Sequence, residues 1–131
     1  MTQNIKNLIS KEESENLEFK SSLSESKEII QTISAFANTK GGKIIVGVSN
    51  LKNILGINIG KDTVERLGNQ ISQNTDPKIY PSVTTEKIKD KFLIIIKIKE
   101  SSDHLALAFG RPYKRVGKST VRISKDEYEK I

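Results

Sequence analysis

The stretch Ala35-Phe36-Ala37-Asn38-Thr39-Lys40-Gly41-Gly42-Lys43-Ile44-Ile45-Val46-Gly47-Val48 decides the fold. Its first residues complete an apolar helix face, whose members recur at helical spacing: Ile29, Ile30, Ile33, Phe36 and Ala37. The glycine pair ends this helix, because glycine tolerates the left-handed backbone that a helix end often needs. Residues 43–48 are a nearly continuous apolar run, which predicts a central strand covered on both faces.

The elements on either side follow from the same periodicities. Apolar spacing predicts a short helix over 3–10 and a strand over 17–20, and Ser22 with Glu25 has the spacing of a capping box. Further along we expect a return strand at 54–57, a helix capped by Asp62 and a last helix from Lys125. We also expect two hairpins, one formed by 83–88 with 92–98 and the other by 113–116 with 119–123. Helices and strands alternate early and strands cluster late. The sequence therefore predicts an α+β fold, a mixed β-sheet with two main helices, in one domain over 1–131.

Composition excludes several classes of protein. The 131 residues include no cysteine, so disulfides and cysteine zinc sites are excluded. No apolar stretch approaches the roughly 20 residues of a membrane span, and the N-terminus lacks the pattern of a secretion signal. We expect a cytoplasmic protein with no membrane partner.

The positive charge is concentrated in the second half of the chain. Residues 1–77 hold nine basic and nine acidic side chains, whereas residues 78–131 hold thirteen basic and seven acidic ones. The net charge of +6 therefore arises after residue 77, which favours a surface facing a polyanion. A lysine-rich surface that only aids solubility is the alternative.

Two carboxylates and a lysine stand together near the N-terminus, at Glu13, Glu18 and Lys20. Side chains two apart on a strand share a face, so Glu18 and Lys20 point the same way. Metal-dependent nucleases place a cation and a charge-stabilising lysine in this manner. An ion pair that only fastens the strand is the alternative.

Three separated motifs resemble the Schlafen AlbA-type domain, known earlier as a divergent AAA or DNA-binding domain. They are Glu13 to Lys20, Ala35 to Val48, and Tyr113-x-Arg115-x-Gly117-x-Ser119-Thr120. The resemblance implies a nucleic-acid-binding module of transcriptional regulators or an endoribonuclease acting on tRNA-like substrates. For the nuclease it implies catalytic roles for Glu13, Glu18 and Lys20, with Mg²⁺ or Mn²⁺ held by Glu13, Glu18 and a third acid at position 50. That position is Asn50, a neutral and poorer ligand, which predicts a weakened site.

Two glycine-containing segments also suggest phosphate binding, but their patterns are less specific than the three motifs above. Gly117-Lys118-Ser119-Thr120 matches the end of a Walker loop, but Pro112 occupies the place of its first glycine and the flanks are strand-like rather than helical. We therefore expect no Walker-type ATPase site. The turn around Gly41 could bring backbone N–H groups near a phosphate, or it could only permit a tight turn.

The segment 111–118 is the better binding candidate. Alternation sends Arg111, Tyr113 and Arg115 to one face, where arginine can grip phosphate and tyrosine can stack on a base. The predicted nucleic-acid contacts are Lys40, Lys43, Lys87, Lys89, Arg111, Tyr113, Lys114, Arg115 and Lys118. With five per cent aromatic residues, we expect binding dominated by the backbone of DNA or RNA. The sequence leaves open the metal-dependent endoribonuclease and a protein-interaction domain forming a homodimer.

Overall fold

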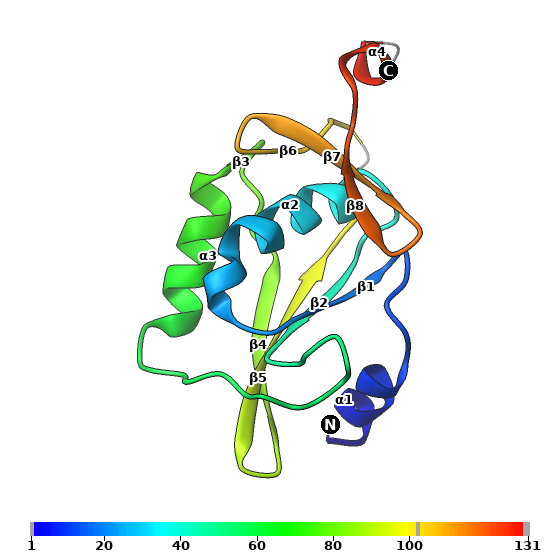
Figure 1. Cartoon of the computed structure of the whole chain (residues 1–131). Coiled ribbons are helices and arrows are strands. Elements are labelled where there is room, and N and C mark those ends of the chain that lie inside the picture. The colour runs from blue at the N-terminus through cyan, green and yellow to red at the C-terminus, as the bar shows by residue number, and fades with distance from the viewer. Residues whose placement is uncertain (1, 102, 130–131) are drawn as a thin grey trace.

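The computed structural model describes residues 2–101 and 103–129, which form two four-stranded sheets on either side of one helix (Figure 1). The helices are α1 (Thr2–Ser10), α2 (Ser26–Ala37), α3 (Thr63–Gln73) and α4 (Lys125–Tyr128), with a 3-10 turn at Leu23–Glu25. The first sheet has the order β1 (Leu17–Lys20), β2 (Gly42–Val46), β5 (Lys91–Ile98), β4 (Ser82–Ile88). The second has the order β3 (Thr75–Asp76), β6 (Leu107–Ala108), β7 (Arg111–Val116), β8 (Ser119–Arg122).

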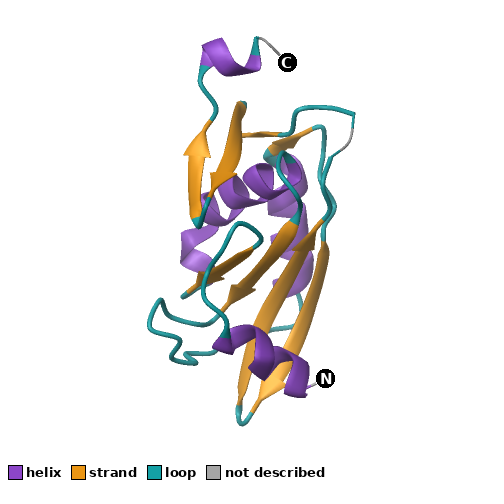
Figure 2. Cartoon of the chain, turned by 90° about the vertical axis from the view of Figure 1, so that its right-hand side faces the viewer, coloured by secondary structure: helices purple, strands orange, loops and turns teal. Residues whose placement is uncertain are grey.

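The first sheet is mixed, as the sequence predicts. Strand β1 runs parallel to β2, while β5 and β4 follow in antiparallel pairs. Parallel neighbours need a crossover connection, and α2 provides it between β1 and β2. Helices α2 and α3 lie on one face of this sheet and α1 lies on the other (Figure 2).

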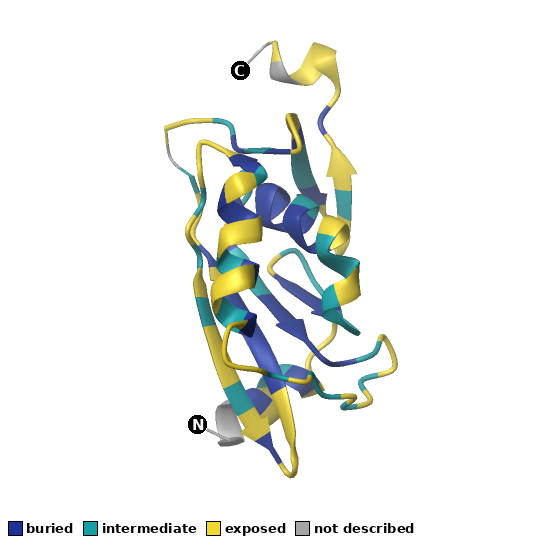
Figure 3. Cartoon of the chain, turned by 90° about the vertical axis from the view of Figure 1, so that its left-hand side faces the viewer, coloured by how far each residue is buried: buried dark blue, intermediate teal, exposed yellow. Residues whose placement is uncertain are grey.

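Helix α2 is buried because both sheets cover it. Its apolar side chains pack on β2 and β5 of the first sheet and contact β6, β7 and β8 of the second. Ile29, Ile33 and Phe36 are completely buried. Buried residues follow the central strands and the inner sides of the helices, whereas the outer side of α3 is exposed (Figure 3). The hydrophobic core therefore surrounds α2, the helix that ends within residues 35–48.

Polar side chains on α2 attach the second sheet to the helix. Ser34 Oγ donates to the carbonyl of Ala106 at 2.9 Å and accepts from the N–H of Tyr113 at 3.2 Å. Asn38 Nδ2 donates to the carbonyls of Ala106 and Tyr113 at 2.8 and 2.9 Å, and Asn38 Oδ1 accepts from the N–H of Ala106 at 2.7 Å. Backbone groups of Ala106, just before β6, and of Tyr113 in β7 thus find partners on α2 and its C-terminal cap rather than in water.

Helix α1 covers only part of the opposite face. Ile5 and Ile9 pack there on Ile45 and Ile95, among other apolar side chains of the first sheet. Lys43 and Lys97 lie on this same face, two residues beyond Ile45 and Ile95 on their strands, where the cover ends. The sheet is therefore apolar under α1 and cationic beside it.

Most predicted elements are confirmed. Several of them lie within a residue or two of the expected bounds. They are the helix over 3–10, the helix with the apolar face at 29–37, the strand at 17–20, the two hairpins and the last helix. Ser22 and Glu25 form the predicted capping box. In the parts of the chain that are described, no helix is long and apolar enough to cross a membrane.

Two expectations differ from the structure. Residues 54–57 form no strand, since Ile54 makes a single bridge to Val48 and Gly56 turns the chain with a φ of 80°. Helix α3 begins where expected, but Asp62 makes no side-chain cap; instead Thr63 Oγ1 accepts from the N–H of Gly60 at 2.8 Å. Strands β3 and β6 were not expected from the sequence, because two residues are too short to show a period.

Candidate functional site

The predicted carboxylate cluster lies where β1 meets the second sheet. Leu17 and Phe19 of β1 pack on the α1 side, so Glu18 between them points to the opposite face. There Glu18 Oε1 accepts from Arg115 Nη1 at 2.8 Å, and Glu18 Oε2 lies 3.4 Å from Lys20 Nζ. The Glu18 side chain is 12% exposed and that of Arg115 is 0% exposed. A buried ion pair therefore joins the two sheets.

Burial dominates the electrostatics of Glu18. Removal from water raises the pKa of this carboxyl group above its ordinary value, against the lowering effects of Lys20 and of the Arg115 hydrogen bond. The negative charge of Glu13 raises the Glu18 pKa further, so the two carboxylates are close enough to interact. Glu13, Glu18 and Lys20 are thus brought together, as the motif predicts.

The arrangement does not fit a divalent cation. Both oxygens of Glu18 face cationic groups, and Glu13 Oε2 accepts from the N–H of Phe19 at 2.9 Å. Asn50 lies exposed in the turn after β2. Among the described residues, no three histidine, cysteine, aspartate or glutamate side chains gather closely enough to hold a metal. A hard cation prefers several free oxygen ligands, which this site does not offer.

Arg115 is placed differently from the exposed position that alternation suggested. Its Nη2 donates to the carbonyls of Ser14 and Leu17 at 2.8 and 3.2 Å, and its Nη1 also donates to Thr120 Oγ1 at 3.0 Å. The guanidinium carbon lies 4.8 Å from the centre of the Phe36 ring, a cation–π distance. Because these partners enclose the side chain, we leave Arg115 out of any surface that meets a phosphate.

The glycine turn is explained by packing. Gly41 has a φ of 74°, and its N–H donates to the carbonyl of Phe36 at 2.7 Å. A Cβ on Gly42 would lie 2.9 Å from the Phe36 ring and from the Asn16 carbonyl. The N–H of Lys43 donates to that same carbonyl at 2.9 Å. The backbone groups of Gly41 and Lys43 are therefore used inside the protein.

The Walker-like segment joins two strands. Gly117, with a φ of 59°, and Lys118 form the turn between β7 and β8, where Val116 pairs with Ser119. The hairpin predicted around these residues is confirmed. Strand β8, and not a helix, directly follows the turn, so the segment lacks the helix N-terminus that a Walker loop directs at phosphates.

The other predicted binding residues lie in separate regions. Lys40 pairs with Glu15 at 3.3 Å on the surface, and Lys114 pairs with Glu127. Tyr113 is half-buried and packs against the core. The exposed cations among them lie apart, since the β4–β5 turn is at the lower end of the molecule in Figure 1 and the second sheet is in its upper half. They are Lys87 and Lys89 near that turn, and Arg111 and Lys118 on the second sheet.

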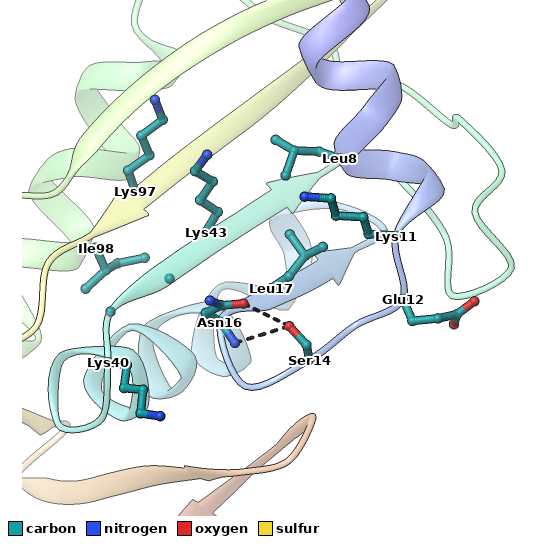
Figure 4. A pocket seen from close by; sticks show the side chains of 12 residues that line it. Leu8, Lys11, Glu12, Ser14, Asn16, Leu17, Lys40, Lys43, Lys97 and Ile98 are labelled. Carbon is teal, nitrogen blue, oxygen red and sulfur yellow. Dashed lines mark hydrogen bonds between the residues drawn. The ribbon is translucent and has the colours of Figure 1, made fainter.

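A lysine-lined groove beside α1 is the place where cations converge. Lys43 of β2 stands directly opposite Lys97 of β5, and Lys11 follows the end of α1 (Figure 4). The sequence predicts Lys43 as a contact and Lys97 as one of the hairpin lysines that extend the cationic patch, but it does not bring the two together and does not include Lys11. Their common feature is visible in the sequence, because Lys43 begins one apolar strand and Lys97 lies near the end of another. Antiparallel pairing of two such strands brings these positions together.

The family model described as Schlafen, AlbA_2 matches residues 13–124. The chain belongs to the Schlafen AlbA_2 family. The match includes β1, the glycine turn and both predicted hairpins. No curated protein matches the chain.

Solved structures share the fold of this AlbA_2 domain. A crystal structure of the DIP2311 protein from Corynebacterium diphtheriae superposes with a TM-score of 0.74 and 15% identity, covering 98% of this chain but 27% of that one. A solution structure from Nitrosomonas europaea gives a TM-score of 0.64 and 22% identity, covering 94% of this chain and 92% of that one. It is the N-terminal domain of a protein described as related to the ATP-dependent DNA helicase RecG. The chain thus spans about a quarter of the first protein and nearly all of the second domain.

Proposed function

We propose that this AlbA_2 domain binds DNA or RNA through the phosphate backbone, with little dependence on base sequence. The supporting observation is a set of predicted binding cations that meet no carboxylate at ion-pair distance within the described residues: Lys43, Lys87, Lys89, Arg111 and Lys118. Cations of this kind can neutralise phosphates and release counterions, which is the main source of sequence-independent affinity.

We expect contacts to the backbone, rather than to bases, because aromatic residues make up 5% of the sequence. Base stacking on proteins uses exposed aromatic rings. Tyr113, the aromatic residue predicted to contact nucleic acid, is half-buried against the core. The lysines and Arg111 remain, and such side chains position a protein on phosphates without reading sequence.

The family and its structural neighbour are consistent with this proposal. The neighbour's name links its N-terminal domain to a DNA helicase-related protein. A role in transcriptional regulation, implied by the family resemblance, is part of the same proposal, as are a cytoplasmic location and a possible homodimer.

Fluorescence anisotropy with a labelled single-stranded RNA and a labelled DNA duplex tests the proposal. If about four phosphates are contacted, raising the salt from about 50 to 200 mM should weaken binding roughly 50- to 150-fold. The same charge on a polyglutamate peptide is the control, and it should bind at least tenfold more weakly. Absence of binding to both nucleic acids at low salt would refute the proposal.

The same samples test the endoribonuclease alternative. Each is incubated with tRNA and Mn²⁺ or Mg²⁺ and examined on a denaturing gel. Asn50→Asp adds the missing carboxylate at an exposed turn, so it should fold normally. Cleavage by the natural chain that rises in Asn50→Asp would establish an enzyme in place of a binding module.

A further inference from the structure

The groove beside α1 is built from residues of four elements or their ends. Lys11 follows α1, Leu17 belongs to β1, Lys43 to β2 and Lys97 to β5. Two hollows of about 360 and 400 Å³ share Lys11, Lys43, Lys97 and Leu8, so they continue into each other across the sheet face. The result is an elongated groove rather than a single small pocket.

The lysines in this groove are not neutralised by the protein. Figure 4 shows the side chains of Lys43 and Lys97 alongside one another with that of Lys11 reaching toward them. No carboxylate in the described part of the chain lies at ion-pair distance from any of the three. Glu12, at the rim, is paired with Lys52 at 2.9 Å, and Figure 4 shows it pointing away. Glu86 lines the second hollow and leaves the balance there positive.

The register makes this arrangement unfavourable in the free protein. Lys43 and Lys97 are direct cross-strand partners on the same face of an antiparallel pair. Like charges in that relation destabilise a sheet. An external anion would relieve the repulsion, and Lys43, half-buried beside α1, is less able than Lys97 to turn away into solvent.

The lining also indicates what kind of anion fits. Ammonium groups bind phosphate as point charges, and Leu8 and Leu17 give the floor an apolar surface suited to sugar carbons. No aromatic side chain lines either hollow in the described residues, so bases have nothing to stack on. Phosphates spaced along a strand match a line of lysines better than one isolated ion does.

We propose that this groove holds consecutive phosphates of a nucleic-acid strand, with Lys43 and Lys97 as the central contacts and Lys11 at the end. The inference rests on the proposed function and assigns it a position. The groove lies on the α1 face of the first sheet, away from the β7–β8 segment that the sequence favoured.

The test compares three proteins in the anisotropy assay: the natural chain, Lys43→Gln/Lys97→Gln, and the control Lys61→Gln/Lys78→Gln. The control removes the same charge from exposed lysines flanking α3 and β3, away from the groove. The groove variant should bind about tenfold or more weakly, and its salt slope should fall by about 1.4 to 1.8, which corresponds to two lost phosphate contacts. The control should bind within about threefold of the natural chain, because its lysines make no such contacts.

Each outcome decides between the two proposals. Normal binding by the natural chain with equal losses in both variants would overturn the groove and leave the proposed function standing. Absence of binding by the natural chain would overturn both. If circular dichroism shows that the double variant is unfolded, Lys11→Gln replaces it, with an expected slope change of about 0.7 to 0.9. No difference between Lys11→Gln and the control would then overturn the groove.

Discussion

The junction between β1 and β7 and the groove beside α1 treat their cations in opposite ways. At the junction, Arg115 is enclosed, and each of its two terminal nitrogens donates to two oxygen atoms of the protein. In the groove, Lys43 and Lys97 stand opposite each other with no protein anion at ion-pair distance among the described residues. Arg115 is paired within the protein and therefore stabilises the fold. Lys43 and Lys97 face each other with like charge, which indicates an anionic partner outside the protein.

The largest expected effect is at the junction. Arg115→Met should lower the free energy of unfolding by about 3–5 kcal/mol, because it leaves the buried Glu18 carboxylate with Lys20 alone and removes one donor from each of two carbonyls. Urea denaturation measures the change. Arg111→Met on the same strand is exposed and should stay within about 0.5 kcal/mol of the natural chain. A loss below about 1 kcal/mol in Arg115→Met would mean that the pair is not structural.

The pH dependence of stability sharpens the same comparison. Burial raises the pKa of Glu18, so the folded state binds that proton more tightly than the unfolded state does. The free energy of unfolding should therefore fall as pH rises from the ordinary glutamate value of about 4.3 toward the raised value. Urea denaturation of the natural chain and Glu18→Gln across this range isolates the contribution. If the natural chain instead gains stability relative to Glu18→Gln as pH rises, Arg115 and Lys20 outweigh burial.

The smallest expected effect is in the groove, and it has the opposite sign. Lys97→Gln should raise the free energy of unfolding by about 0.2–0.5 kcal/mol at low salt, since it removes a like charge facing Lys43. The gain should vanish at about 0.5 M salt, where such repulsion is screened. Lys99→Gln, exposed just beyond the same strand, is the matched control and should change little. A loss of stability in Lys97→Gln would show that the lysine pair is not under repulsion.

The sequence predicts those parts of the fold that local periodicity controls. The apolar face of α2 and the glycine pair place the helix and the central strand correctly, and alternation finds both hairpins. Periodicity shows which side chains share a face of a strand, but not whether that face packs on another part of the protein or is exposed to solvent. Alternation groups Arg115 with Arg111 and Tyr113, yet Arg115 alone reaches Glu18, a residue on the other sheet and 97 positions earlier.

The candidate site also has a part that local sequence predicts and a part that depends on long-range contacts. Glu13, Glu18 and Lys20 are close in sequence, so the motif alone brings them together. The groove depends on the register of β2 with β5 and on the docking of α1, which are long-range features. Lys11 and Lys97 could not be assigned to one site without them.

The amide of Asn38 makes three of the hydrogen bonds that attach the second sheet to α2. Its nitrogen donates to the carbonyls of Ala106, just before β6, and of Tyr113 in β7, and its oxygen accepts from the N–H of Ala106. Asn38→Asp would keep the shape of the side chain but replace a donor by a charged oxygen beside those carbonyls. This variant should therefore lose the attachment of the second sheet before the rest of the molecule unfolds.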